Sequence, residues 1–264
     1  MTVFFSDVEG FTSLCEQLTP DAAVRCLNKY FSLASIPIRE ANGIIDKYIG
    51  DAIMAFWGPP FTDEREHASL ACRAALAQLE RLEELKRALP DVLGLRKGLP
   101  KMNVRVGLAT GDVTVGNIGS ETTKGYTVIG DTVNLASRLE GANKLYGTRL
   151  LISNATADLV QDSMETREID AIRVVGKTEP VQVHELLGLK GALDPRTARL
   201  RDEFSAGLGS YRRCEWAAAQ ASFAACLALK ADDGPSNVYV ARVRHFAANP
   251  PPREWDGVWS LAEK

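Results

Sequence analysis

The amino-acid sequence predicts a mixed α+β fold in which helices cover an antiparallel sheet. Short apolar runs bounded by glycine or proline recur along the first 187 residues, and such runs are typical of buried strands. Between them lie longer segments whose apolar residues are three and four positions apart, as in a helix with one buried face. Without its insertions, the order of these elements is βαββαβ. This order is that of the ferredoxin-like fold, with helices on one face of the sheet.

Local signals define the individual elements in chain order. Residues 3–7 form a short apolar run, and the helix after Thr19 begins with proline, which suits the first helical position. A hairpin is expected where Gly50-Asp51 separates two apolar strands. The expected strands are 3–7, 44–49, 52–57, 102–109, 112–118, 149–152, 168–175 and 181–187, and the expected helices begin near Phe11 and Pro20 and cover 67–89, 131–145 and 154–161.

The composition changes after the last of these strands. Residues 188–195 predict a linker. Beyond it, two apolar helical stripes over 200–211 and 216–227 resemble a single tetratricopeptide-like helical hairpin. One such repeat cannot bury its own apolar face, so we expect it to dock on the main domain, on a partner chain or on sequence outside this chain. We therefore expect two domains, residues 1–188 and the helical tail 189–264.

Bulk composition argues against several classes of protein. With 264 residues, 45% of them hydrophobic and 25% charged, the chain has the composition of a globular protein. Its net charge of −3 carries no basic excess, so no nucleic-acid partner is expected. Five cysteines without a CxxC pair predict a reduced, cytoplasmic chain, and no apolar run is long enough to be a membrane segment. The abrupt start of the first strand predicts a fragment, which leaves room for a membrane-tethered parent protein.

Two aspartates stand where apolar, strand-like runs break. Asp7 follows the first apolar run, and Asp51 lies between the two strands of the expected hairpin. A carboxylate is costly to bury unless something neutralises it, and two carboxylates on neighbouring strands make an oxygen site suited to Mg²⁺ or Mn²⁺. Taken alone, each aspartate is better explained as the cap of a turn or helix. The metal site therefore depends on the motifs downstream.

Further polar residues complete a candidate site. Asn134 and Arg138 are four residues apart in a helix expected to begin at Asp131, so they share one face near a helix N-terminus, which favours anions. Ordinary helices also carry such pairs, so the pair alone decides nothing. Three basic residues either contribute to the same cleft or are solvated surface charges: Lys47, Arg105 and Lys177.

Together and in this order, the motifs resemble the catalytic domain of the class III nucleotidyl cyclases, the adenylyl and guanylyl cyclases. The resemblance covers about residues 2–187, and Tyr126–Glu140 matches the most diagnostic block of that family almost residue for residue. It implies that ATP or GTP is converted into the cyclic monophosphate and pyrophosphate. It also implies two divalent metal ions per site, Mg²⁺ or Mn²⁺, held by Asp7 and Asp51 with help from the backbone carbonyl of Val8.

The same resemblance assigns roles to the other candidates. Asn134 is expected to orient the ribose and Arg138 to stabilise the transition state as catalytic residues. An arginine fork suits the charged equatorial oxygens of that state better than a lysine does. Four residues are expected to bind the substrate, two at the purine and two at the triphosphate, respectively: Lys47 and Thr127, and Arg105 and Lys177.

The residues expected at the purine favour ATP. Lys47 only donates hydrogen bonds, which suits the N1 acceptor of adenine, and Thr127 is able to accept one from the 6-amino group. Many adenylyl cyclases have Asp where this chain has Thr127. In having threonine there, the chain resembles the bicarbonate-responsive soluble cyclases. This resemblance implies a bicarbonate effector. The threonine hydroxyl also donates, so guanylyl cyclase activity stays an alternative.

In this family the metal-binding aspartates come from one subunit and the Asn/Arg pair from the other. Since the chain carries both sets, the resemblance implies a head-to-tail homodimer with two shared sites. A catalytically inactive, cyclase-like dimerisation or sensor module is an alternative, although such domains usually lose one of these residues. A diguanylate cyclase is not favoured, because its Gly-Gly-Asp/Glu-Glu-Phe hairpin is absent.

Overall fold

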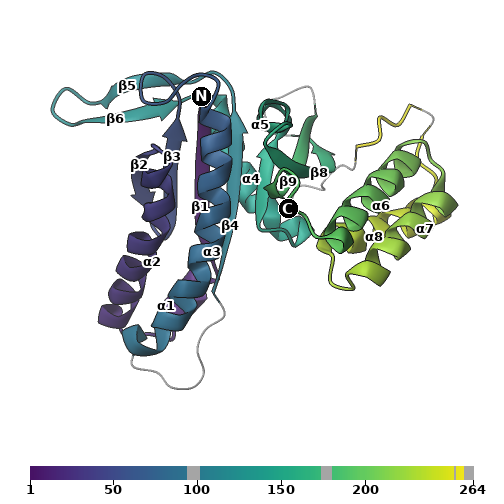
Figure 1. Ribbon diagram of the computed structural model, residues 1–264, viewed down its shortest axis with the longest axis horizontal. Coiled ribbons are helices and arrows are strands. Elements are labelled where there is room, and N and C mark those ends of the chain that lie inside the picture. Colours follow the sequence, from purple (N-terminus) through teal and green to yellow (C-terminus); the bar gives the residue numbers. More distant parts are fainter. Residues whose placement is uncertain (94–101, 174–179, 253, 259–264) are drawn as a thin grey trace. The chain divides into compact units, whose positions relative to one another are not determined.

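The structure, a computed structural model, describes residues 1–93, 102–173, 180–252 and 254–258 (Figure 1). It divides into two compact units, each with its own core. The first unit holds residues Met1–Asn143 and Arg149–Val160, and the second holds Lys144–Thr148 and Gln161–Lys264. The predicted domain boundary at residue 188 stays a prediction, and the second unit groups the last strand pair with the helices that follow it.

The elements of the first unit follow the predicted order, with one additional strand at Lys124–Ile129. They are β1 (Thr2–Glu9), α1 (Phe11–Cys15), α2 (Pro20–Glu40), β2 (Ile44–Ile49), β3 (Ala52–Trp57), α3 (His67–Leu93), β4 (Asn103–Thr110), β5 (Thr114–Gly119), β6 (Lys124–Ile129), α4 (Asp131–Tyr146, whose last three residues belong to the second unit), β7 (Leu150–Ser153) and α5 (Asn154–Val160).

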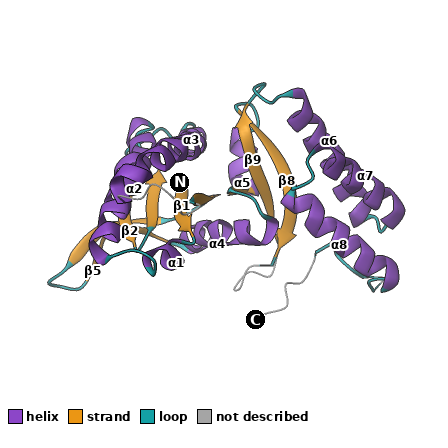
Figure 2. Ribbon diagram, turned by 90° about the horizontal axis from the view of Figure 1, so that it is seen from below, coloured by secondary structure: helices purple, strands orange, loops and turns teal. Residues whose placement is uncertain are grey.

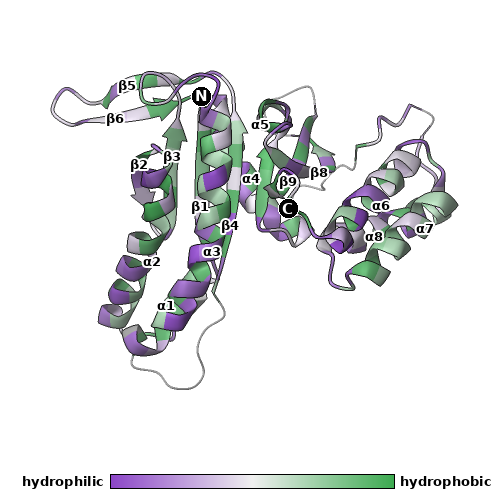
Figure 3. Ribbon diagram, in the orientation of Figure 1, coloured by the Kyte–Doolittle hydropathy of each residue, from purple (hydrophilic) through white to green (hydrophobic). Residues whose placement is uncertain are grey.

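The main sheet of the first unit has the neighbour order β2-β3-β1-β4-β7. The first three pairings are antiparallel, and β4 pairs with β7 in parallel. Apolar residues fill β1, β3 and β4, where they form much of the buried core (Figure 3). The order β2-β3-β1-β4 is that of the ferredoxin-like fold, so the predicted α+β class is confirmed.

Helices cover both faces of this sheet rather than one face as predicted. Figure 2 shows α2 and α3 side by side over the strands, and Val104 of β4 lines a small cavity between these two helices. Gly107, three residues along the same strand, lies directly against α4. Because successive side chains of a strand point to opposite faces, α4 covers the face that α2 and α3 leave open.

The strand expected at 112–118 is present but lies outside the main sheet. It forms β5, which pairs with β6 in a separate two-stranded antiparallel sheet instead of extending the main sheet. No strand was predicted at β6. This hairpin carries Thr127 directly opposite Gly116.

The second unit joins a strand pair to three helices. Strands β8 (Met164–Ile172) and β9 (Val181–Leu189) are antiparallel, and they are followed by α6 (Pro195–Arg212), α7 (Trp216–Leu229) and α8 (Gly234–Ala248). Two of the helices were predicted, and α8 was not. The helices share an aromatic core in which the rings of Phe204, Phe223 and Tyr239 contact one another.

Ion pairs attach the helices of this unit to β8. Arg167 of β8 forms a two-pronged bond with Asp233, the N-cap of α8, at 3.0 and 3.1 Å. Asp170 of the same strand accepts from Arg242 of α8 and from the hydroxyl of Tyr146, at 2.6 Å in each case. The helical tail therefore docks on the last strand pair, which was one of the three places considered for it.

Candidate active site

Strand alternation decides where the Asp7 side chain points. The neighbouring Ser6 faces α2, where its hydroxyl lies 3.4 Å from that of Tyr30. Asp7 therefore points to the opposite face, together with its cross-strand partner Arg105. The guanidinium of Arg105 donates to the Asp7 carboxylate at 3.2 Å. Both side chains are largely buried.

Asp51 reaches the same place from the β2–β3 turn. Gly50 has a φ of +62° there, a left-handed conformation that glycine adopts at little cost. Since β3 pairs with β1, the turn lies beside the end of β1 that carries Asp7. Burial, and next the neighbouring carboxylate of Asp7, raise the pKa of Asp51 to about 6. The two aspartates therefore lie close enough to repel each other.

This pair fits a hard divalent cation. Two carboxylates that repel each other in a partly buried place are stabilised by a cation between them, and Mg²⁺ and Mn²⁺ prefer oxygen ligands. Within the described residues, no group of three or more His, Cys, Asp or Glu side chains forms a metal site. Asp7, Asp51 and the Val8 carbonyl would therefore share the ions with water and substrate phosphates, as is usual for Mg²⁺.

Arg105 is committed to two carboxylates. Besides Asp7, it donates from Nε to Glu140 of α4 at 2.9 Å. Burial raises the pKa of Glu140, against the opposing effect of Arg105. Glu140 was not among the predicted site residues, although the sequence places it two positions after Arg138. Its contact with Arg105 links α4 to β4 and, through Arg105, to Asp7 of β1.

The helix α4 presents its predicted catalytic residues on an exposed face. Asn134 and Arg138 are both exposed, whereas Leu135, Ala136 and Leu139 are buried. The i, i+4 spacing therefore places the two polar side chains together as predicted, at the start of the helix and on the side away from the sheet.

The buried side of α4 lies unusually close to β4. A Cβ atom at Gly107 would lie 2.2 Å from the carbonyl oxygen of Ala136 and 2.3 Å from the amide nitrogen of Glu140. Only a residue without a side chain fits there. One turn further along, Asn143 donates to the Val106 carbonyl of β4 at 2.9 Å. These contacts fix the height of α4 above the sheet.

The two residues predicted at the purine meet through a third that was not predicted. Thr127 of β6 donates its hydroxyl proton to the carboxylate of Asp46 at 2.6 Å, and the ammonium of Lys47 lies 3.7 Å from the same oxygen. A register shift between Ile45 and Lys47 places a β-bulge at Asp46. The bulge disturbs the strict alternation of the strand, so neighbouring side chains are able to reach one place.

Comparison with known proteins identifies the family. The sequence model described as "Adenylate and Guanylate cyclase catalytic domain" matches residues 1–188. The chain belongs to this family. It is 37% identical over 198 residues to adenylate cyclase 1 of Rhizobium meliloti, a match that covers 75% of this chain and 29% of that relative. The chain thus spans less than a third of the length of that relative.

Solved cyclase structures resemble the chain as well. The adenylyl cyclase CyaB of P. aeruginosa is 34% identical with a TM-score of 0.65, and the match covers 73% of this chain and 96% of that one. The guanylyl cyclase Cya2 is 31% identical with a TM-score of 0.64, covering 73% and 94% respectively. Cyclases named for either purine are therefore similarly close to this cyclase domain.

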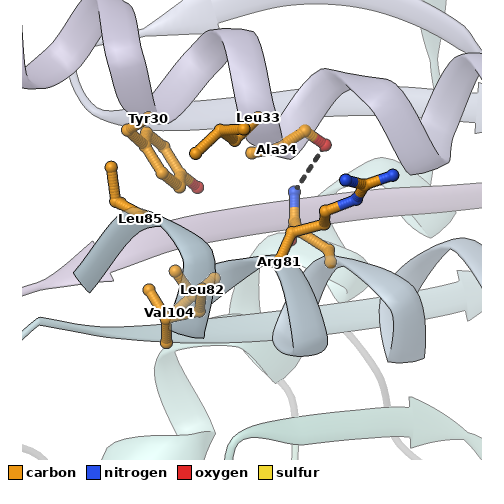
Figure 4. A pocket seen from close by; sticks show the side chains of 8 residues that line it. Tyr30, Leu33, Ala34, Arg81, Leu82, Leu85 and Val104 are labelled. Atoms are coloured by element: carbon orange, nitrogen blue, oxygen red, sulfur yellow. Dashed lines mark hydrogen bonds between the residues drawn. The ribbon is translucent and has the colours of Figure 1, made fainter. Parts of the chain in front are cut away.

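A small cavity of the cyclase domain lies apart from the site. The cavity of about 10 Å³ between α2 and α3 has room for about one water molecule and is far too small for a nucleotide (Figure 4). In it, Gln78 donates to the Ala34 carbonyl at 3.2 Å.

The predicted triphosphate residue Lys177 lies outside the described residues. No helix in the described part of the chain is long and apolar enough to cross a membrane.

Proposed function

We propose that this chain is the catalytic domain of an adenylate cyclase, which converts ATP into 3′,5′-cyclic AMP and pyrophosphate. The observation that carries the proposal is the meeting of Asp7 and Asp51, in which burial and mutual repulsion raise the pKa of Asp51 to about 6. Perturbed carboxylates of this kind mark functional sites. The family and the presence of Asn134 and Arg138 on one exposed helical face support the same conclusion.

The reaction needs in-line attack of the ribose 3′-oxygen on the α-phosphorus. Two divalent ions, when bound, would lower the pKa of that hydroxyl and neutralise the leaving phosphates. Asp7, Asp51 and the Val8 carbonyl would hold these ions, and Arg105 fixes the Asp7 carboxylate in place. Asn134 orients the ribose. Arg138 donates to the equatorial oxygens as negative charge develops on them.

Helix geometry supports a site shared by two copies of the chain. At 3.6 residues per turn, Glu140 lies about 200° around α4 from Arg138. Glu140 points toward Asp7 through Arg105, so Arg138 points away from the aspartates of its own chain. A head-to-tail homodimer would supply each pair of aspartates with the Asn134 and Arg138 of the other copy.

Exposed apolar side chains give that homodimer a surface. Five large apolar residues are 42% to 51% exposed on β2, on β6 and in the loop after β3: Tyr48, Ile49, Phe61, Tyr126 and Ile129. The rings of Phe61 and Tyr126 contact each other at 5.9 Å. Exposed apolar patches mark interaction surfaces, and this one includes the strand that carries Thr127.

The test is a product assay with the purified chain, Mn²⁺ and either ATP or GTP. We expect cyclic AMP from ATP, and no product from an Asp7→Ala chain under the same conditions. Absence of both cyclic nucleotides from a folded, dimeric chain would contradict the proposal and favour the inactive dimerisation or sensor module. Cyclic GMP as the main product would favour guanylyl cyclase activity.

Two further properties belong to the proposal. The presence of Thr127 supports stimulation by bicarbonate, and a flat rate across a bicarbonate titration at fixed pH would contradict it. The five cysteines are free, as expected in a reducing compartment, which supports a cytoplasmic location for the catalytic domain.

A further inference from the structure

The carboxylate of Asp46 is buried in the middle of the proposed purine site. Its side chain is 2% exposed, whereas that of Lys47 is 48% exposed and 3.7 Å away. Its close hydrogen bond is the one accepted from the Thr127 hydroxyl at 2.6 Å. Thr127 is itself buried. The main partner of this buried carboxylate is therefore a hydroxyl group, with the lysine further off.

This hydrogen bond determines what Thr127 offers to a base. A threonine hydroxyl has one proton to donate and two lone pairs that accept. An ionised carboxylate only accepts, so the bond to Asp46 commits the single proton of Thr127. The remaining capacity of the Thr127 oxygen is then that of an acceptor. This removes the ambiguity of a threonine at this position, whose hydroxyl otherwise suits either partner.

Adenine and guanine differ at the group that would meet this oxygen. Adenine carries a 6-amino group, which donates, and guanine carries a 6-oxo group, which accepts. An acceptor facing the 6-oxo group leaves two oxygens unpaired in a buried place, which is unfavourable. An acceptor facing the 6-amino group completes a hydrogen bond. Sites built to hydrogen-bond one group discriminate strongly against an analogue that lacks it.

We propose that Asp46 is a positioning residue for base selection: by holding the hydroxyl proton of Thr127, it leaves that oxygen as an acceptor and selects a 6-aminopurine nucleotide over a 6-oxopurine nucleotide. This inference rests on the proposed function, since it assumes that the purine binds beside Lys47 and Thr127. It adds a residue that does not touch the base and acts only through its neighbour.

The decisive variant is Asp46→Asn, which keeps the shape of the side chain. Its amide both donates and accepts, so the Thr127 hydroxyl is released to donate to a base. We expect the ratio of kcat/KM for ATP to that for GTP to fall about tenfold. The Thr127 proton would then be held by a neutral amide instead of a carboxylate, and hydrogen bonds to neutral and to charged groups differ by about the free energy of a tenfold change. A purely structural role would lower both values together and leave the ratio unchanged. That result would overturn the inference.

A double-mutant cycle tests the route through Thr127. Thr127→Val removes the hydroxyl, so adding Asp46→Asn to it should change the ratio no further, whereas independent effects would add. Thr127→Ser keeps the hydroxyl and should keep the wild-type ratio. The matched control is Asp158→Asn, a carboxylate on the surface of α5 that pairs only with Asn154 among the bonds described, and it should also keep the ratio.

Binding distinguishes failure of this inference from failure of the proposed function. Calorimetric titration of ATP and of GTP in the presence of Mn²⁺ gives the same ratio without turnover. If the wild type binds ATP more tightly than GTP but forms no cyclic product, the proposed function fails and the base selection is still measured. If Asp46→Asn does not fold, Thr127→Val and Thr127→Ser carry the test. Equal binding of ATP and GTP by the wild type would overturn the role of Asp46.

Discussion

The acidic pair at the end of β1 and the charged residues of β8 are both partly or fully buried, yet their charges are balanced differently. On β8, Arg167 meets Asp233 and Glu185, and Asp170 meets Arg242, so each buried charge has an opposite partner. Although burial opposes it, the bonds from Arg167 lower the pKa of Asp233. At the candidate active site Arg105 is shared by Asp7 and Glu140, whereas burial and the Asp7 carboxylate raise the pKa of Asp51 to about 6.

This difference separates a structural role from a functional one. Matched buried charges hold elements together, and the loss of one partner leaves an uncompensated charge. Carboxylates that face each other repel and so weaken the fold locally, but a bound cation neutralises that repulsion. We therefore expect substitutions in the two regions to affect different quantities, the rate of cyclisation in one and the free energy of unfolding in the other.

The largest expected effect is that of Asp51→Asn on the rate. Because a bound metal ion would supply several kcal/mol of transition-state stabilisation, loss of Asp51, its proposed ligand, should lower the rate of cyclic AMP formation by about 10³-fold. The free energy of unfolding should stay the same or rise, since an unmatched charge is removed. Product assays and denaturant titrations measure the two quantities. A clear loss of stability without a loss of rate would reverse the comparison.

Arg138→Ala should lower the rate by about 10²–10³-fold, the usual effect of removing one preorganised donor. Its exposed position predicts little change in stability. Mixed with the Asp51→Asn chain, it should regain about a quarter of the wild-type rate, because half of the randomly formed dimers then contain one intact site out of two. No recovery in a proven mixed dimer would argue against shared sites.

Arg242→Met tests the matched region. It leaves the buried Asp170 without its cation and should lower the free energy of unfolding by about 3–5 kcal/mol. Adding Asp170→Leu should restore part of this loss, because the second substitution removes the unpaired charge. Denaturant titration of both variants measures the effect. Equal stability of Arg242→Met and the wild type would show that the pair contributes nothing to the fold.

The smallest effect concerns pH. His67 is buried with its Nδ1 2.8 Å from the Thr2 hydroxyl, and burial lowers the pKa of its imidazole. The unfolded chain then binds a proton more readily than the folded one. Its contribution to stability should therefore be full above about pH 6.5 and decline as the pH falls toward the lowered pKa. Denaturant titrations between pH 5 and 8 should show a shallower decline for His67→Gln than for the wild type.

Strands and helices that show a contiguous or periodic set of apolar residues were predictable from the sequence. Elements whose position depends on pairing with another part of the fold were not. Strands β1, β3 and β4 are buried, so their apolar residues are contiguous. Strand β6 is mostly exposed and, among the described strands, pairs only with β5, so it lacks such a run. Helix α8 begins at Gly234-Pro235, and its buried face includes Arg242, which forms an ion pair. This charged residue interrupts the apolar pattern by which the helix would be recognised in the sequence.

The candidate site divides in the same way. The meeting of Asp7 and Asp51 follows from the hairpin order of their strands, and the shared face of Asn134 and Arg138 follows from helical spacing. Asp46 was missed because a bulge is needed to bring it to Thr127, 81 residues away in the sequence. Such contacts depend on tertiary structure, and no local pattern reports them.

The absence of a side chain at Gly107 has a practical consequence for engineering. Valine or isoleucine in the middle of a buried strand is an ordinary choice when a sheet is to be strengthened, and glycine there is normally a weakness. At this one position, the added side chain would push α4 away from β4 and shift Asn134 and Arg138, which lie on that helix. A more rigid but slower protein is the expected outcome of that redesign.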